Sequence, residues 1–271
     1  MVSLSNRIDY EIPIVWWNVS LSPPLSSTRG KASEEKIQSV ASVINRFIEL
    51  GYFLICLGEV STSDIVKLSE LLELDKKGFS YVEGADKQGR LYFDTAIIYS
   101  TKLQILQQEN GRFCDHSIFS IEERNLKIYE KYVFFNSDIG QKLNIFLSHW
   151  PSQKRDVSIN VTEISIELRK KVHELLEDDE NVILMGDYNL EPYSKEIVNH
   201  LHTSRDRNYV NRKKKVLYNP CWNLLPVYPD NKIHGTFEYP SNNREWHVLD
   251  QVMFSRSFMS NPWIVDDSLI F

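Results

Sequence analysis

The chain has 271 residues, of which 42% are hydrophobic and 12% aromatic. This apolar content is enough to bury a large core, which excludes disorder for the bulk of the chain. The formal net charge of -6 argues against non-specific coating of nucleic acid, so any phosphate binding must depend on a local basic region.

The three cysteines, Cys56, Cys114 and Cys221, show no CxxC spacing. Neither a disulfide framework nor a thiolate zinc site is therefore indicated. No segment approaches the roughly 20 apolar residues of a membrane span, and the N-terminus lacks the pattern of a secretory signal. We expect a soluble, cytoplasmic protein with no membrane span.

The first part of the chain alternates strand and helix. Short aromatic, aliphatic and β-branched runs predict strands over 14–19 and 53–57. Apolar residues at helical spacing predict one helix from Glu34 to Gly51 and another from Ser63 or Asp64 through Leu72. The second strand is apolar without alternation, as expected for a strand covered on both faces.

The middle of the chain is richer in strands than in helices. Strands are predicted over 79–82, 92–99, 103–106, 129–135 and 143–149. A helical pattern over 161–176 then leads into a buried strand over 182–187. A helix around 194–202 and two strands near 235–239 and 247–254 complete the expected elements.

Mixed strands and helices, with some strands covered on both faces, favour two stacked sheets with helices outside. We therefore predict an α/β fold, a four-layer αββα sandwich of two mixed, mainly antiparallel sheets, as one domain over 1–271. A doubly wound single sheet is the alternative, but it requires helices between the strands of residues 79–149.

Polar residues lie at or just after the ends of four of these strands. Asp187 and Asn189 lie two residues apart in Gly186-Asp187-Tyr188-Asn189, so in an extended chain they face one site. His149 ends its strand just before Pro151. The same residues also suit a simple turn and a structural histidine, so the two interpretations stay open.

Asn18 and Glu59 follow the two N-terminal strands. An amide oxygen and a carboxylate are suitable hard ligands for Mg²⁺, which takes only one or two protein carboxylates. The alternatives are a turn residue at Asn18 and an acid flanking a helix at Glu59.

In combination, seven short motifs resemble the endonuclease/exonuclease/phosphatase superfamily in their order along nearly the whole chain. They are Trp17-Asn18-Val19, Gly58-Glu59-Val60, Asp94-Thr95-Ala96-Ile97-Ile98-Tyr99, Ser148-His149-Trp150, Gly186-Asp187-Tyr188-Asn189, Gly235-Thr236-Phe237 and Leu249-Asp250-Gln251-Val252. This superfamily includes DNase I-like and apurinic-site nucleases, inositol polyphosphate phosphatases, sphingomyelinases and deadenylases. The resemblance implies metal-dependent phosphoester hydrolysis on a four-layer sandwich.

The resemblance also implies roles for individual residues. Asn18 and Glu59 resemble the pair that binds the metal, Mg²⁺ or Mn²⁺. Asp187 resembles the acid that aligns or deprotonates the attacking water. Asn189 and His149 resemble the groups that hold the scissile phosphate and its developing charge. Asp250 resembles the acid that orients a catalytic histidine.

That histidine marks a departure from the family pattern, in which it lies in a late Ser-Asp-His stretch. No histidine follows His247 in this chain. Residues three apart face opposite sides of a strand, which disfavours His247 as the partner of Asp250, and His234 requires a loop that folds inward. We expect the chain to lack the C-terminal strand that carries the histidine; natural loss is the alternative.

A basic stretch at 205–215 holds six basic residues and one acid. Arg205 and Arg207 in it, with Lys154 and Arg155 after His149, are the candidate substrate-binding residues. The alternative for the stretch is an exposed solubilising loop. Three aromatic residues also offer stacking surfaces for bases or, alternatively, belong to the core: Trp150, Tyr188 and Trp222.

The sequence thus predicts a divalent-metal-dependent phosphodiester hydrolase, with a nuclease as the leading subtype and nucleic acid as its substrate. The first alternative is a phosphatase for an inositol phosphate or phospholipid. The second is a catalytically degenerate member that binds nucleic acid or a protein partner. Protein partners are not indicated.

Overall fold

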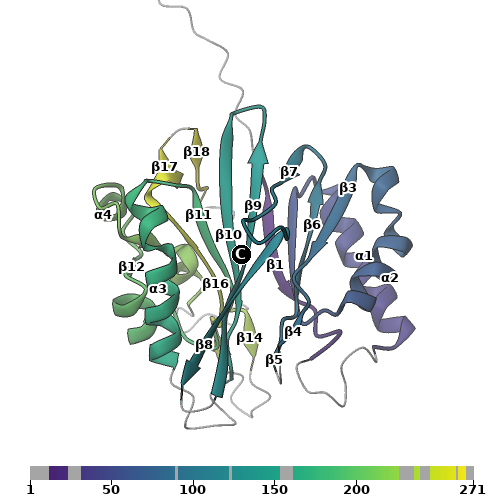
Figure 1. Ribbon diagram of the computed structural model, residues 1–271, viewed down its shortest axis with the longest axis horizontal. Helices are drawn as coiled ribbons and strands as arrows, with labels where there is room; N and C mark the ends of the chain where they lie inside the picture. Colours follow the sequence, from purple (N-terminus) through teal and green to yellow (C-terminus); the bar gives the residue numbers. More distant parts are fainter. Residues whose placement is uncertain are drawn as a thin grey trace, which may run out of the picture.

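The computed structural model describes residues 12–23, 32–88, 91–121, 124–152, 161–225, 235–238, 245–260 and 262–266. Two large mixed sheets stack face to face, with helices on both outer faces (Figure 1). This arrangement confirms the predicted four-layer sandwich and rules out the single doubly wound sheet.

The first sheet has four strands, in the order β1 (Ile14–Asn18), β2 (Leu54–Gly58), β6 (Thr95–Ser100) and β3 (Phe79–Glu83). Strands β1 and β2 are parallel, and the other pairs are antiparallel. Helices α1 (Glu34–Glu49) and α2 (Thr62–Leu72) cover its outer face (Figure 1).

The second sheet has eight strands. Its order is β12 (Thr203–Ser204), β13 (Leu217–Tyr218), β16 (Asp250–Phe254), β11 (Val182–Asp187), β10 (Gln141–His149), β9 (Arg124–Asn136) and β7 (Leu103–Ile105), with β8 (Cys114–Ile121) also paired to β9. Helix α3 (Val161–Glu177) packs on its outer face. Strands β10 and β11 are parallel, so they end at the same edge of the sheet.

The remaining elements are short. They are η1 (Leu74–Lys77), β4 (Lys87–Gln88), β5 (Leu91–Tyr92), the π-helical turn η2 (Glu196–His200), α4 (Arg207–Asn211), η3 (Pro220–Leu224), β14 (Phe237–Glu238), β15 (Trp246–His247), η4 (Arg256–Phe258), β17 (Met259–Ser260) and β18 (Trp263–Ile264).

Alternation along the buried strands divides the core into three layers. On β2, Cys56 faces the layer between the two sheets, whereas Ile55 and Leu57 face α1 and α2. On β10, Ile145 faces the layer between the sheets and Phe146 faces α3. Successive side chains on a strand point to opposite faces, so a strand covered on both sides needs no polar alternation.

A capping box sets the connection after β2. The Ser61 side chain accepts the backbone N–H of Asp64, and the Asp64 carboxylate accepts the backbone N–H of Ser61 at 2.9 Å. Asp64 also accepts the Ser22 hydroxyl at 2.5 Å, which ties the segment after β1 to the start of α2. Glu59 therefore lies in a short connection held at both ends.

The structure differs locally from the predicted elements. Residues 114–121, which were not expected to be a strand, form β8 and pair with the long strand β9. The predicted strand over 92–99 is divided between β5 and β6. The expected helix around 194–202 is a five-residue π-helical turn. Within the described ranges, no helix is both long enough and apolar enough to cross a membrane.

Candidate active site

Strand register brings three predicted residues together on the second sheet. His149 is directly opposite Asp187 in the parallel β10–β11 pair, and Asp187 is opposite Asp250 in the antiparallel β11–β16 pair. Residues directly opposite each other on neighbouring strands have adjacent side chains. A histidine and two carboxylates therefore form a row across the edge of this sheet.

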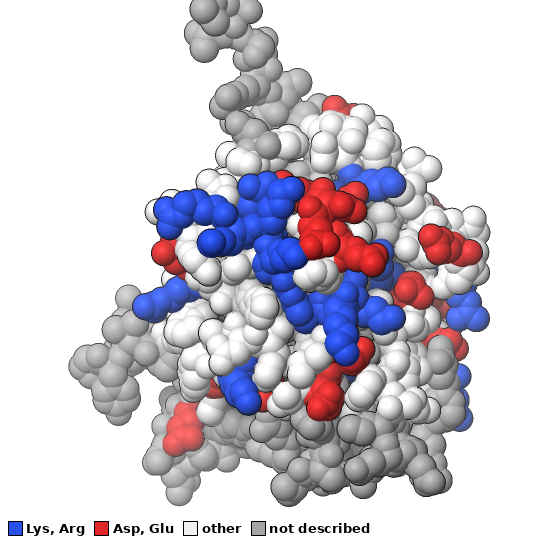
Figure 2. Space-filling model, turned by 60° about the vertical axis from the view of Figure 1, so that its left-hand side comes forward, with Lys and Arg blue, Asp and Glu red and all other residues white. Residues whose placement is uncertain are grey.

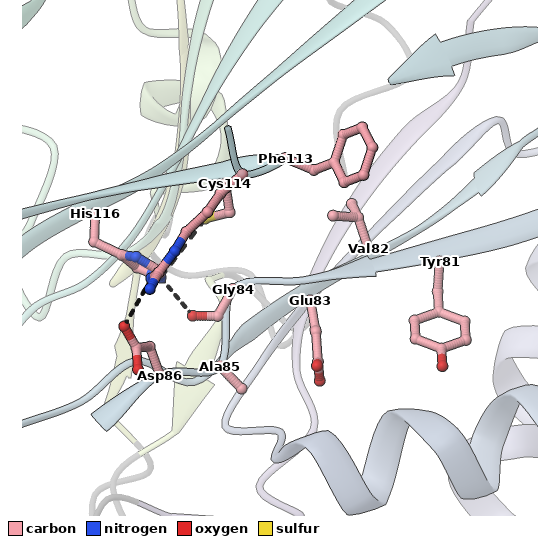
Figure 3. A pocket seen from close by; sticks show the side chains of 10 residues that line it. Tyr81, Val82, Glu83, Gly84, Ala85, Asp86, Phe113, Cys114 and His116 are labelled. Carbon is pink, nitrogen blue, oxygen red and sulfur yellow. Dashed lines mark hydrogen bonds and ion pairs between the residues drawn. The ribbon is translucent and has the colours of Figure 1, made fainter. Parts of the chain in front are cut away.

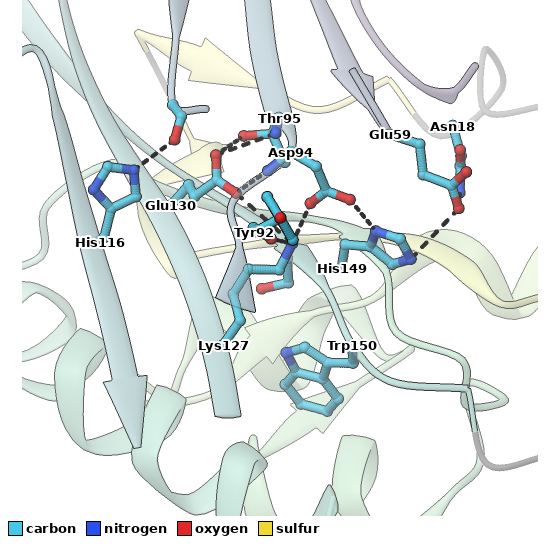
Figure 4. A network of polar contacts seen from close by, with 12 residues as sticks. Asn18, Glu59, Tyr92, Asp94, Thr95, His116, Lys127, Glu130, His149 and Trp150 are labelled. Carbon is cyan, nitrogen blue, oxygen red and sulfur yellow. Dashed lines mark hydrogen bonds and ion pairs between the residues drawn. The ribbon is translucent and has the colours of Figure 1, made fainter. Parts of the chain in front are cut away.

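The first sheet contributes Asn18 and Glu59 at the corresponding edge. The Asn18 Nδ2 donates a hydrogen bond to Glu59 Oε1 at 3.1 Å. Glu59 Oε1 in turn lies 3.8 Å from His149 Nε2 on the second sheet. The structure thus joins the residues predicted separately on the two sheets into one cluster (Figure 4).

Trp16 makes a second link between the sheets that the sequence did not indicate. Its Nε1 donates to Asp250 Oδ1 at 2.7 Å, across 234 positions of the chain. Trp16 and Asn18 are two apart on β1 and so share a face, which is the only sequence signal for this role. A Cβ at Gly58 would come within 2.8 Å of the Trp16 ring, so Gly58 leaves the space that this indole fills.

Two of the predicted residues have left-handed backbone conformations. The φ angle is 56° at Glu59 and 51° at Asn189. Asparagine adopts this region readily, but for glutamate it is uncommon and costs of order 1 kcal/mol or more. Such strain collects at functional sites, where surrounding structure fixes the direction of a side chain.

Asn189 closes the turn after β11. Its backbone N–H donates to Asp187 Oδ1 at 2.9 Å, and its Nδ2 donates to the Trp150 carbonyl at 2.8 Å. The rings of Trp150 and Tyr188 are fully buried and pack edge to face at 4.9 Å, so they belong to the core and not to a stacking surface. Gly186, with φ of +153°, lies so close to the Ser148 carbonyl that a Cβ would overlap it.

Burial raises the pKa of both carboxylates that lie opposite each other on β11 and β16, Asp187 and Asp250. Burial raises the pKa of Asp250 first, and the charge of Asp187 raises it further, to about 6. Burial also raises the pKa of Asp187, although the charge of His149 and the Asn189 N–H oppose the rise. Two buried carboxylates this close favour either a shared proton or a nearby cation.

The imidazole of His149 is held by Asp94, which the sequence motif contained but to which no role was assigned. His149 Nδ1 donates to Asp94 Oδ2 at 3.0 Å, which leaves Nε2 facing Glu59. Burial by itself lowers the pKa of His149, but the charge and hydrogen bond of Asp94 outweigh it, so that the pKa is raised. The geometry therefore favours a protonated, oriented imidazole.

Asp94 is fully buried and is balanced by Lys127, whose Nζ contacts Asp94 Oδ1. Lys127 Nζ also lies 3.9 Å from the fully buried Glu130. Glu130 accepts the backbone N–H groups of Asp94 and Thr95 at 3.2 and 3.3 Å. Sequence reasoning missed Lys127 and Glu130, which lie inside a long strand and belong to no recognised motif. Figure 4 shows the network that continues from them to His149.

The two predicted substrate-binding residues that the structure describes, Arg205 and Arg207, make their contacts outside this cluster. Lys154 and Arg155 lie outside the described residues. The Arg205 guanidinium lies over the Trp222 ring at 5.1 Å. Arg207 donates to the Val265 carbonyl at 2.8 Å and begins α4, which Figure 1 places at the end of the sandwich opposite β14. Lysine and arginine side chains form a band, with acids beside it, on the flank that Figure 2 brings forward.

Of the two histidines considered as partners of Asp250, the structure describes only His247. His234 lies outside the described residues. His247 Nδ1 is hydrogen-bonded to Glu191 Oε1 at 2.6 Å, and Glu191 Oε2 accepts the Val248 N–H at 3.2 Å. His247 is thus oriented by Glu191, whereas the Asp250 carboxylate is engaged by Trp16.

The two-sheet sandwich thus carries carboxylates, amides and a histidine at one edge of both sheets. The chain belongs to the Endonuclease/Exonuclease/phosphatase family, whose sequence profile matches residues 26–264. Members of this family are hydrolytic phosphoesterases. A search of curated proteins gives no match.

Solved structures share the fold at low sequence identity. The human Nocturnin catalytic domain with bound sulfate is 12% identical, with a TM-score of 0.59 over 90% of this chain and 82% of that one. A Bacteroides thetaiotaomicron mannosyl-6-phosphatase is 16% identical, with a TM-score of 0.59 over 90% and 85%. D. rerio TDP2 complexed with a single-strand DNA product is 16% identical, with a TM-score of 0.53 over 93% and 86%.

Proposed function

We propose that this protein is a divalent-metal-dependent phosphodiester hydrolase that acts on nucleic acid. The observation that carries the proposal is the convergence of His149 with the carboxylates of Glu59 and Asp187 at one edge of both sheets. These groups supply what phosphoester hydrolysis needs: oxygen ligands, a proton acceptor and a cationic hydrogen-bond donor.

The residues of the site fit Mg²⁺ or Mn²⁺. The Asn18 amide and the Glu59 carboxylate are hard oxygen ligands at the ends of adjacent strands. Burial is the main cause of the raised pKa of Asp187, and the charge of Glu59 adds to it. Asn18 and Glu59 would hold the ion. Bound there, the ion would supply Lewis-acid polarisation of a phosphoryl oxygen.

The remaining groups have separate tasks in the proposed reaction. Asp187, held by the Asn189 N–H, orients the attacking water and accepts its proton. His149, protonated and held through Nδ1 by Asp94, donates from Nε2 to a phosphoryl oxygen as negative charge develops. Asn189 contributes a second donor to the same phosphate. Asp250 tunes the charge of Asp187, to which it is opposite.

Nucleic acid is the proposed substrate because basic residues are concentrated in two segments of this otherwise acidic chain. Lys154 and Arg155 follow His149 by only five and six positions in the sequence. Arg205 and Arg207 belong to the basic stretch at 205–215. Because Arg207 lies at the end of the sandwich opposite β14, this stretch would contact only phosphates far along the nucleic-acid chain from the reacting one. The TDP2 structure with a single-strand DNA product has the same fold and supports this substrate class.

The test is incubation with single- and double-stranded DNA and RNA in Mg²⁺ or Mn²⁺. We expect metal-dependent cleavage that Asp187→Ala reduces by at least about 10⁴-fold, as for other residues central to a hydrolytic site. The matched control is Asp178→Ala, which removes an exposed carboxylate at the end of α3. Cleavage that survives Asp187→Ala would contradict the mechanism.

The same experiment distinguishes the alternatives. Release of inorganic phosphate from an inositol phosphate, with all four nucleic acids intact, would replace nuclease activity with phosphatase activity. No hydrolysis of either class of substrate, in either metal, would identify a catalytically degenerate member.

A further inference from the structure

A second cluster of potential metal ligands lies on the β8–β9 ladder, away from the predicted catalytic residues. Cys114 and His116 are two apart on β8 and so share a face, and His116 is directly opposite Glu130 on β9. One potential ligand atom from each of the three residues lies within 4.8 Å of the other two. The cluster thus combines a thiol, an imidazole and a carboxylate.

The distances suit a tetrahedral ion. Cys114 Sγ lies 3.8 Å from His116 Nε2. With Zn–S and Zn–N bonds of about 2.3 and about 2.0 Å, this separation gives an S–Zn–N angle of about 120°, near the tetrahedral value.

The surroundings also suit an ion. Gly84 lets the Glu130 carboxylate and the Tyr132 hydroxyl pack against its backbone, because a Cβ there would overlap both and lie 3.1 Å from Cys114 Sγ. Gly84, Cys114 and His116 also line a cavity of about 530 Å³ (Figure 3). The cavity supplies room for water as a further ligand.

We propose that Cys114, His116 and Glu130 bind one Zn²⁺ ion. Thiolate and imidazole together select Zn²⁺ over Mg²⁺, which prefers oxygen ligands alone. The ion would replace the proton that His116 Nε2 now shares with the Gly84 carbonyl at 2.6 Å, and binding would also release the thiol proton of Cys114.

The proposed site is connected to the candidate active site through Glu130. Its carboxylate accepts the backbone N–H of Asp94, whose own carboxylate holds His149. Figure 4 shows His116 and Glu130 at one end of this network and Glu59 at the other. Zinc bound at Glu130 would therefore fix the backbone from which Asp94 orients His149.

The test is cobalt and zinc binding to the metal-stripped 271-residue chain in excess Mg²⁺. Co²⁺ bound by a thiolate gives a sulfur-to-cobalt charge-transfer absorption, which oxygen ligands at the candidate active site cannot produce. We expect this absorption at one Co²⁺ per chain. We also expect Cys114→Ser and His116→Gln to abolish it and to weaken Zn²⁺ binding by at least about 100-fold in chelator competition.

The matched controls make the same substitutions at a cysteine and a histidine outside the proposed zinc site. Cys221→Ser removes another buried thiol, and His173→Gln removes a histidine on α3; both should retain the absorption. His116→Gln keeps an N–H donor for the Gly84 carbonyl. If Cys114→Ser fails to fold, the absorption of His116→Gln with Co²⁺ therefore tests the proposed site. A wild-type chain without the absorption, or an absorption unchanged in Cys114→Ser and His116→Gln, would overturn the proposal.

Discussion

Replacement of Lys127 by methionine should cost the protein much of its stability. The lysine side chain is 11% exposed and contacts the fully buried Asp94, and it also lies 3.9 Å from the buried Glu130. Methionine keeps most of the length of the lysine side chain but removes the ammonium, whose Nζ lies 5.9 Å from the centroid of the Phe93 ring. Because removal of one partner leaves a buried charge uncompensated, we expect Lys127→Met to lower the free energy of unfolding by about 3–5 kcal/mol.

The loss of unfolding free energy in Lys127→Met should become smaller as the pH falls. Burial raises the pKa of Asp94, but the charges of Lys127 and His149 outweigh it and hold the pKa below its ordinary value. A lowered folded-state pKa gives stability that is present above the unfolded pKa of about 3.9 and is lost as pH falls through the folded pKa. Without Lys127, only His149 opposes the effect of burial, so we expect the pKa of Asp94 to rise. The difference between wild type and Lys127→Met should therefore narrow as pH falls from about 7 to about 4.

Denaturant unfolding at several pH values measures both effects. Lys131→Met is the control, because Lys131 is on the same strand but its Nζ lies over the Phe146 ring. The double variant Asp94→Asn/Lys127→Met should recover part of the loss, since it removes one of the two uncompensated carboxylates. A cost for Lys127→Met below about 1 kcal/mol, or a difference that stays constant with pH, would refute this reasoning.

Three further substitutions test the site. Trp16→Phe removes the hydrogen bond to Asp250, whose charged acceptor makes it worth about 1.5–3 kcal/mol, so hydrolysis should fall at least about tenfold; an unchanged rate would contradict the bridging role. Gly186→Ala should lower the free energy of unfolding by more than about 3 kcal/mol, because the Cβ would overlap the Ser148 carbonyl; a thermal melt like that of wild type would argue against this close approach. Glu59→Gln should raise the Mg²⁺ concentration needed for half-maximal cleavage at least about tenfold, which metal titration measures; an unaltered titration would exclude Glu59 as a ligand.

Local patterns predicted much of the fold. The strands 14–19, 53–57, 143–149 and 182–187 were expected from apolar runs, and the structure confirms all four with end shifts of at most two residues. Strand β8 was missed because its sequence alternates only weakly between Cys114 and Ile121 and gains its pairing from the distant strand β9. A short strand with weak alternation depends on tertiary pairing more than on its own propensity.

The sequence by itself determined which polar residues end the strands, because strand periodicity and turn chemistry act over a few positions. This local information placed Asn18, Glu59, His149, Asp187 and Asn189 at strand ends, although not their contacts with one another. Only the tertiary structure decided those contacts. Asp94 meets His149 across 55 positions and Trp16 meets Asp250 across 234, because strand register and the stacking of the two sheets are fixed by packing over the whole core.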